Sequence, residues 1–343
     1  MPAAKGSSSK KKMLAVLEIL KKYSDENNPI NSLDIISRLE KEYGIIAERK
    51  SVYSDIAALK ECGVDIERVN IKREGYYFAS RRFEPPEIRL LTDAVLSARF
   101  ITLKKTRELI QKLSEELSVN QAKCIEKQVY YDKRVKFDNE QIYYVVDTIN
   151  SAIEQGKKIS FIYHHKKISY NKVVNDEGKL FVFSPYALFW EREKYYVAGN
   201  YGKYDSVSNY RLDKMERVEI CEEPIRPFSE VSKYRNYFDT ADYVNKSFMM
   251  YYGEEDMLEL ICDNKLLEIM VDRFGESVRY TNYGEGRFRI RARAYISEGL
   301  EDWIIPYCDR CYIKSPDSLR EKVIEKAMAA AAFLNDSNNG KKI

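Results

Sequence analysis

The chain has few of the residues on which catalytic and metal sites are built. It holds 2 His and 2 Trp among 343 residues, and its 6 Cys are scattered apart from Cys308 and Cys311. A Ser-His-Asp site would have to use His164 or His165, and one C-x-x-C without a second pair or a nearby His is a weak zinc signal. A P-loop, a G-x-S-x-G and an H-E-x-x-H motif are also missing. We therefore expect no enzymatic activity, no metal site and no cofactor.

Long apolar runs and a large charge excess are absent as well. No run approaches the roughly 18–20 apolar residues that span a membrane, and no apolar core follows the basic N-terminus as it would in a signal peptide. We therefore expect a cytoplasmic protein with no membrane partner. The net charge is only +3, which leaves nucleic acid open as a partner because the distribution of charge decides such binding.

The chain is long, highly charged and rich in tyrosine. With 343 residues it exceeds one ordinary core, and its 27 Tyr are typical of half-exposed strands. The hydrophobic period changes from 3.6 to 2 near residue 157, so helices precede strands. The predicted fold class is α+β multidomain. Its predicted parts are a disordered basic tail (1–12), a winged helix-turn-helix (13–82), a helical connector (83–156), a small β-barrel (157–245) and a C-terminal domain (254–335).

Residues 13–82 show the element order of a winged helix. Apolar residues at helical spacing predict helices over 13–23, 33–43 and 48–62, with Asn31 or Ser32 capping the second. A strand pair follows over 64–69 and 76–78. Three helices and a hairpin in this order predict a DNA-binding head for double-stranded operator DNA; the alternative is a small helical domain with ordinary solvated charges.

The outward positions of the third helix and the tip of the hairpin are basic or carry hydroxyl groups. Arg and Lys near a helix N-terminus can reach base edges and phosphates in a major groove, and Ser and Tyr add phosphate contacts. The predicted DNA-binding residues are Arg49, Lys50, Ser51, Tyr53, Ser54, Lys60, Lys72 and Arg73.

The connector is predicted to be helical. Pro85 and Pro86 suit the first turn of a helix, and further helices are expected over 103–117, 121–130 and 140–155. These segments carry more apolar surface than a short connector needs. We therefore expect a homodimer, because a two-fold pair of heads matches a pseudo-palindromic operator.

Residues 157–245 predict five short strands with tight turns, which favours a small barrel. Four segments in this region resemble the WYL domain: Ile162-Tyr163, Ser184-Pro185-Tyr186, Tyr195-Tyr196-Val197 and Tyr210-Arg211-Leu212-Asp213-Lys214-Met215. The third stands where that family usually has Trp-Tyr-Leu, and its departures keep aromatic and aliphatic character. The resemblance implies an Sm-like barrel that senses a ligand in bacterial regulators; in some relatives the ligand is single-stranded nucleic acid.

The same resemblance implies a set of pocket residues, namely Tyr163, Ser184, Tyr186, Tyr196, Tyr210 and Arg211. Their chemistry agrees with an anionic ligand, because Arg offers a planar fork of donors to phosphate and Tyr rings stack on bases. The alternative is that alternate tyrosines simply fill the barrel.

The C-terminal region contains four arginines at alternate positions. In a strand, Arg287, Arg289, Arg291 and Arg293 would all share one face. This face is either solvated beside acidic neighbours, for which Glu285, Glu298 and Asp309 are the candidates, or a basic track for a phosphate backbone.

Three segments here resemble WCX, the C-terminal extension often attached to WYL domains: Asp272-Arg-Phe-Gly275, Trp303-Ile304-Ile305 and Ile313-Lys-Ser-Pro-Asp-Ser-Leu-Arg320. The resemblance implies a βαββα unit that contributes to ligand binding or to dimer contacts. It adds weight to two predicted functions: a ligand-sensing transcriptional regulator or, alternatively, an accessory single-stranded RNA- or DNA-binding protein of a CRISPR or phage-defence system.

Overall fold

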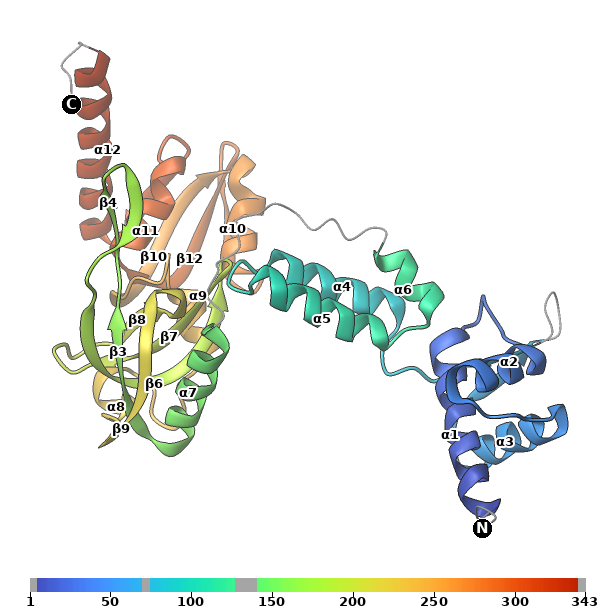
Figure 1. The fold of residues 1–343 in the computed structure, drawn as a ribbon. Helices are drawn as coiled ribbons and strands as arrows, with labels where there is room; N and C mark the ends of the chain where they lie inside the picture. Colours follow the sequence, from blue (N-terminus) through green and yellow to red (C-terminus); the bar gives the residue numbers. More distant parts are fainter. Residues whose placement is uncertain (1–4, 70–74, 127–140, 339–343) are drawn as a thin grey trace. The chain divides into compact units, whose positions relative to one another are not determined.

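The computed structural model describes residues 5–69, 75–126 and 141–338, which fall into two compact units, residues 1–140 and 141–343 (Figure 1). Helices and several separate sheets are both present, so the predicted α+β class is confirmed. Within the described ranges, none of the helices is both long and apolar enough for a membrane span, and His, Cys, Asp and Glu side chains nowhere gather in threes as a metal site would require.

The first unit begins with three helices and a hairpin. These are α1 (Lys5–Tyr23), α2 (Ser32–Tyr43), α3 (Arg49–Glu61), β1 (Ile66–Val69) and β2 (Gly75–Phe78). Asn31 caps α2 in a capping box, because its side chain accepts hydrogen bonds from the backbone of Leu33 and Asp34. Ile30 bridges to Tyr76 at the hairpin, and a Cβ on Gly75 would lie 2.8 Å from the Ile30 carbonyl oxygen. The close approach of these backbones therefore requires glycine.

Helix α1 starts earlier than the sequence predicts. Residues 5–12 are helical, so the prediction of a disordered tail over residues 1–12 is wrong for them. The side chain of Lys12 donates to Ser51 Oγ at 2.6 Å and pairs with Asp55 Oδ2 at 3.1 Å, both on α3. These contacts give the last turn before Met13 a tertiary partner that the sequence pattern does not reveal.

Three further helices complete the first unit: α4 (Pro85–Ser97), α5 (Leu103–Glu115) and α6 (Val119–Glu126). The last part of the predicted helix 121–130 lies outside the described residues. Arg81 joins the end of α1 to the end of α5. Its guanidinium donates to the carbonyl oxygens of Lys21 and Ser24, each at 2.7 Å, and of Glu116 at 3.2 Å.

Helix α7 (Ile142–Gln155) belongs to the second unit, although the sequence placed it in the connector. Figure 1 shows α7 along the sheet, and it packs on β3, β6 and β9 through Ile142, Val145, Ile149 and Ala152, which are buried. An amphipathic stripe shows that one side of a helix is covered, but it does not show which element covers it. For that reason the predicted domain boundary at residue 156 is wrong, and the boundary lies before α7.

The sheet under α7 has five strands in the order β8-β7-β6-β3-β9. Its two edge strands are joined by η1 (Leu212–Lys214), a single 3₁₀ turn, so both edges must lie close together and the sheet curls into a small, partly open barrel. The strands are β3 (Lys157–Tyr163), β6 (Lys179–Glu191), β7 (Lys194–Tyr201), β8 (Ser208–Arg211) and β9 (Met215–Pro224). A separate hairpin, β4 (Lys166–Ser169) and β5 (Lys172–Asn175), was not predicted.

The chain then passes through α8 (Phe228–Val231) and α9 (Thr240–Lys246) into a second sheet of order β11-β12-β10-β13. Its elements follow the β-α-β-β-α-β order of ferredoxin-like units, which extends the predicted βαββα by one strand and a final helix. They are β10 (Glu254–Asp263), η2 (Asn264–Leu266), α10 (Leu267–Phe274), β11 (Arg279–Gly284), β12 (Arg287–Ile296), α11 (Glu298–Ile304), η3 (Ile305–Tyr307), β13 (Cys311–Ser315) and α12 (Asp317–Asn338).

Candidate nucleic-acid interface and ligand pocket

Helix α3 presents most of its predicted DNA-contacting side chains to solvent. Arg49, Lys50, Ser54 and Lys60 are exposed, and Tyr53 is 40% exposed. Neutral hydroxyl groups surround the Arg49 guanidinium: its Nε lies 3.3 Å from Ser32 Oγ and its Nη2 lies 3.3 Å from Tyr53 OH. These contacts orient the side chain without cancelling its charge.

Ser51 differs from the other predicted contacts on α3. It is half-buried and its hydroxyl accepts the hydrogen bond from Lys12, so it is engaged within the head. Sequence reasoning missed Lys12 because it assigned that residue to the tail. The predicted wing contacts Lys72 and Arg73 lie outside the described residues.

The second unit contains a cavity of about 750 Å³ at the open edge of the barrel. The end of β3 contributes Tyr163, β7 contributes Tyr196 and β8 contributes Arg211. The turn between β6 and β7 adds Arg192, and Lys194 follows at the start of β7. The volume lies within the range of small-molecule sites, and aromatic and cationic side chains share the lining.

Arg211 is fixed in this cavity by a carboxylate behind it. Its Nε lies 2.9 Å from Asp213 Oδ1 and its Nη2 lies 2.6 Å from Asp213 Oδ2, a two-point contact that sets the plane of the guanidinium. Burial alone would lower the pKa of Arg211, but the hydrogen bonds to Asp213 outweigh it and raise the pKa above its ordinary value. The group therefore stays charged and oriented.

Two tyrosines of the cavity, Tyr163 and Tyr196, stay neutral. Burial raises the pKa of the Tyr163 hydroxyl and, again chiefly by desolvation, that of Tyr196. Lys214 stands 5.7 Å from the centre of the Tyr163 ring, and burial lowers the pKa of its ammonium group. The cavity thus offers neutral rings and hydroxyl donors beside fixed positive charge.

Three of the six predicted pocket residues do not line this cavity. Ser184 is buried and its Oγ accepts from the backbone of Arg226 at 3.0 Å, while Tyr186 donates to the Arg226 carbonyl oxygen at 2.8 Å. Tyr210 points into the barrel, with its ring centre 5.1 Å from Phe183 and 5.3 Å from Phe161. For Tyr210 the alternative interpretation, that alternate tyrosines fill the barrel, fits its position. Tyr186 packs instead on Phe228 and Phe238 of the segment that follows β9.

Sequence reasoning missed one wall of the cavity, the turn formed by Met249, Met250, Tyr251 and Tyr252. This turn falls between the two predicted domains, at residues assigned to neither. Both methionines have positive φ (50° and 63°), a conformation that side chains rarely adopt. Asn209 of β8 holds the turn by donating to the Met250 carbonyl oxygen at 2.9 Å. The two methionines form a tight turn between Phe248 and Tyr251, which bridge each other, as the positive-φ pair Arg192 and Glu193 does between β6 and β7.

The four arginines of β12 lie elsewhere in the unit and do not line the cavity. Each alternates with a buried apolar residue, so the prediction that they share one face is confirmed. Their acidic neighbours are Glu255 and Glu259 of β10, not the predicted Glu285, Glu298 or Asp309. Strand pairing decides the neighbours of a strand, and the pairing of β10 with β12 was not visible in the sequence.

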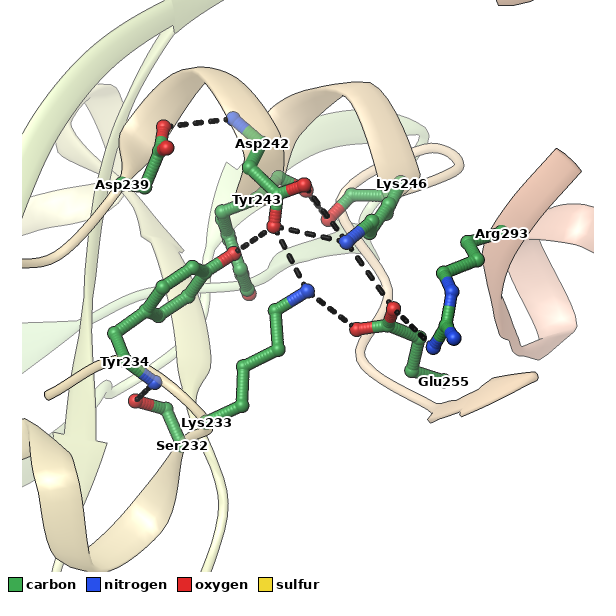
Figure 2. A network of polar contacts seen from close by, with 10 residues as sticks. Ser232, Lys233, Tyr234, Asp239, Asp242, Tyr243, Lys246, Glu255 and Arg293 are labelled. Atoms are coloured by element: carbon green, nitrogen blue, oxygen red, sulfur yellow. Dashed lines mark hydrogen bonds and ion pairs between the residues drawn. The ribbon is translucent and has the colours of Figure 1, made fainter. Parts of the chain in front are cut away.

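A polar network connects α9 to the end of this sheet (Figure 2). Asp242 pairs with Lys246 at 2.7 Å and with Lys233 at 2.9 Å. Glu255 pairs with Lys233 at 2.6 Å, with Lys246 at 3.1 Å and with Arg293 at 3.4 Å. Two carboxylates therefore share three cations where the segment between the sheets meets β10 and β12.

The WYL-domain family model matches residues 144–220 of the chain. None of the curated proteins matches the chain. Among solved structures the chain is similar to the proteasome accessory factor B/C (PafBC) of Arthrobacter aurescens, with 16% sequence identity over 93% of this chain and 48% of that chain, and a TM-score of 0.27. The chain thus spans about half the length of that protein, and at this TM-score the likeness adds nothing to the assignment.

The range that the WYL-domain family model matches runs from α7 into β9 and includes Tyr163, Tyr196 and Arg211 of the cavity. Residues 144–220 are therefore a WYL domain.

Proposed function

We propose that the chain is a DNA-binding transcriptional regulator whose WYL domain binds an anionic effector, such as a single-stranded nucleic acid. The observation that carries the proposal is the charge of the cavity. Of the described residues that line it, Arg192, Lys194 and Arg211 are cationic and none is acidic. Cations held beside neutral tyrosine rings in a concave site suit phosphate groups and stacked bases.

The head supports the DNA-binding part of the proposal. Helices α2 and α3 pack on α1, and β1 and β2 follow as a hairpin, in the order of a winged helix-turn-helix. The exposed Arg49 and Lys50 stand at the first turn of α3, where a recognition helix contacts DNA. In this function an effector changes affinity for the operator only if it binds two arrangements of the protein unequally, and a homodimer would present two heads to a palindromic site.

Effector binding is tested by fluorescence anisotropy with labelled single-stranded DNA and RNA and with mononucleotides as competitors, at one stated salt concentration. Arg211→Ala should weaken binding at least tenfold, about 1.4 kcal/mol. Because that change leaves Asp213 without its counter-charge, Arg192→Ala serves as a second variant. Lys172→Ala, on the exposed β4–β5 hairpin, is the control and should leave the affinity within twofold. Equal affinity for all four proteins would refute an anion site in the cavity.

Operator binding is tested with duplex DNA from the region upstream of the gene. The double variant Arg49→Ala, Lys50→Ala should lose duplex binding and keep the effector affinity, whereas Lys41→Ala with Lys112→Ala removes the same charge from α2 and α5 and should keep both. Light scattering at micromolar concentration tests the homodimer, and a monomeric mass would contradict it.

A second candidate is the accessory single-stranded RNA- or DNA-binding protein. The combination of Arg211 with Tyr163 and Tyr196 favours it, because these side chains suit a single strand as well as a small effector. Full single-stranded binding by the wild type, with no duplex binding at any upstream sequence, would favour this candidate over the regulator.

A further inference from the structure

One face of the β11-β12-β10-β13 sheet exposes arginine side chains to solvent among the described residues. Phe288, Ile290 and Ala294 on the opposite face are buried under the helices of the unit. The arginines between them point away, and the side chains of Arg291 and Arg293 are 47% and 66% exposed. The end of this face near Tyr295 is closed, because α9 packs on β12 there.

This open face carries more positive than negative charge. By strand register it holds six cations, namely Arg279, Arg287, Arg289, Arg291, Arg293 and Lys314. Its carboxylates are Glu255, Glu259 and Asp263.

The carboxylates of the open face are too heavily shared to balance this charge. Glu259 alone faces Arg289 at 3.7 Å, Arg291 at 3.6 Å and Lys314 at 3.1 Å. Glu255 also serves Lys233 and Lys246 in the network of Figure 2.

Two of the arginines are placed where like charges oppose each other. Arg279 on β11 is the direct cross-strand partner of Arg291 on β12, and like charges in that position destabilise a sheet. In the part of the chain that the structure describes, Arg279 and Arg287 form no ion pair. Asp263 is the cross-strand partner of Arg287, but the two side chains are not within ion-pair distance. An anion from outside the chain would relieve this repulsion.

We propose that the open face binds the backbone of a single-stranded nucleic acid. Successive arginines on β12 are two residues apart, about 6.8 Å, and the row from Arg287 to Arg293 is about 20 Å long. A row of this length fits a polyanion better than a single phosphate. Tyr312 lies on the same face, because Ile261 is the register partner of both Tyr312 and Arg289. The residue is 55% exposed, with the Arg320 guanidinium 5.9 Å from its ring centre, and an aromatic ring at such a position can stack on a base.

This surface is separate from the WYL cavity, and the inference goes beyond the proposed function. Residues of the open face come from β10 to β13, whereas the cavity is lined by β3, β7, β8 and the turn of Met249 and Met250. A nucleic-acid strand on the open face and an effector in the cavity therefore contact different side chains. Substitutions can abolish binding at either site without affecting the other.

The test measures anisotropy of labelled oligo-dT and oligo-U of about 20 nucleotides with the full chain. Every protein in the series carries Arg49→Ala and Lys50→Ala, which removes the contribution of the head. The face variant adds Arg279→Ala and Arg287→Ala, the two arginines of the open face that form no ion pair with a described residue. The control instead adds Lys265→Ala and Lys322→Ala, which remove the same charge from η2 and α12.

We expect the face variant to bind both oligonucleotides at least tenfold more weakly and the control to bind within twofold of the parent. Loss of two phosphate contacts should also reduce the slope of log affinity against log salt by about 1.4. No binding by the parent, equal losses in face variant and control, or competition by polyglutamate as strong as by unlabelled oligo-dT would overturn the proposal. The series also includes the parent with Arg211→Ala added. If only this variant loses oligonucleotide affinity, the proposal is overturned and the binding is assigned to the cavity.

Discussion

The two larger sheets of residues 141–338 both gather cations, but they hold them differently. In the WYL cavity the Arg211 side chain is 22% exposed and contacts Asp213 at two points. On the C-terminal sheet the arginines are more exposed and meet shared carboxylates at 3.4 Å to 3.7 Å. A charge pair shielded from water interacts strongly and keeps one geometry, while an exposed pair is weakened by solvent and salt. The cavity is thus suited to selecting a ligand by shape, and the open face to holding a polyanion by charge.

The largest expected effect concerns the packing of the barrel. A Cβ on Gly199 would lie 2.2 Å from the Ser184 carbonyl oxygen and 2.4 Å from the Phe183 ring. Gly199→Ala should therefore lower the free energy of unfolding by about 3 kcal/mol, measured by urea denaturation. Gly202→Ala, where nothing lies within 4 Å of the new Cβ, is the control. Equal stability of the two variants would show that the barrel can rearrange around an added Cβ, and that its packing is no tighter than that of the open face.

The next effect isolates the ion pair of the cavity. Asp213→Asn keeps the shape of the side chain but removes the charge that holds Arg211, and should cost about 2 kcal/mol of stability, since hydrogen bonds to charged groups are worth about 1.5–3 kcal/mol. Urea denaturation measures this cost, and it should persist at high salt. A change below about 0.5 kcal/mol would mean that water screens the cavity as it does the open face.

The segment between the two sheets should show an acid dependence. Burial alone would raise the pKa of Asp242, but hydrogen bonds from Lys246, Lys233 and Tyr234 outweigh it and lower the pKa to about 2 from 3.8. Because the folded value lies below the unfolded one, this stabilisation is complete above about pH 4 and is lost as the pH falls toward 2. Denaturation at a series of pH values should show the decline, and Asp242→Asn should flatten it. An unchanged pH profile in the variant would exclude the network as its source.

The smallest effect on stability is expected on the open face. Glu259→Gln removes the carboxylate shared by Arg289, Arg291 and Lys314. The Glu259 side chain is only 13% exposed, but Arg291 and Lys314 are 47% and 45% exposed, so water screens these pairs and stability should change by less than about 1 kcal/mol. The difference should shrink further between 0.1 M and 1 M salt, as the screening length falls from about 10 Å to about 3 Å. The same variant should bind oligo-dT more tightly than the parent, and weaker binding would contradict the proposed role of the face.

Local patterns were enough to predict most of the elements. Helical spacing gave α2, α3 and α5 nearly as observed, and the alternation of β12 placed its arginines on one side. The four segments that resemble the WYL domain pointed to the region that the family model matches. The same resemblance implies Tyr163, Tyr196 and Arg211 as pocket residues, and the structure brings all three to one cavity.

The remaining features depend on contacts between distant segments. Periodicity shows which side of an element is apolar, but not which other element covers that side. For that reason the sequence could not place α7 on the barrel, separate Tyr210 in the core from Tyr196 at the cavity, or pair the arginines of β12 with Glu255 and Glu259. The Met249–Met250 turn lies at the wall of the cavity, where Asn209, 41 residues away, donates a hydrogen bond to its backbone. The sequence alone determined the elements and the residue types that could bind an anion; the tertiary structure decided which of them meet, because packing and strand pairing join residues that no local pattern relates.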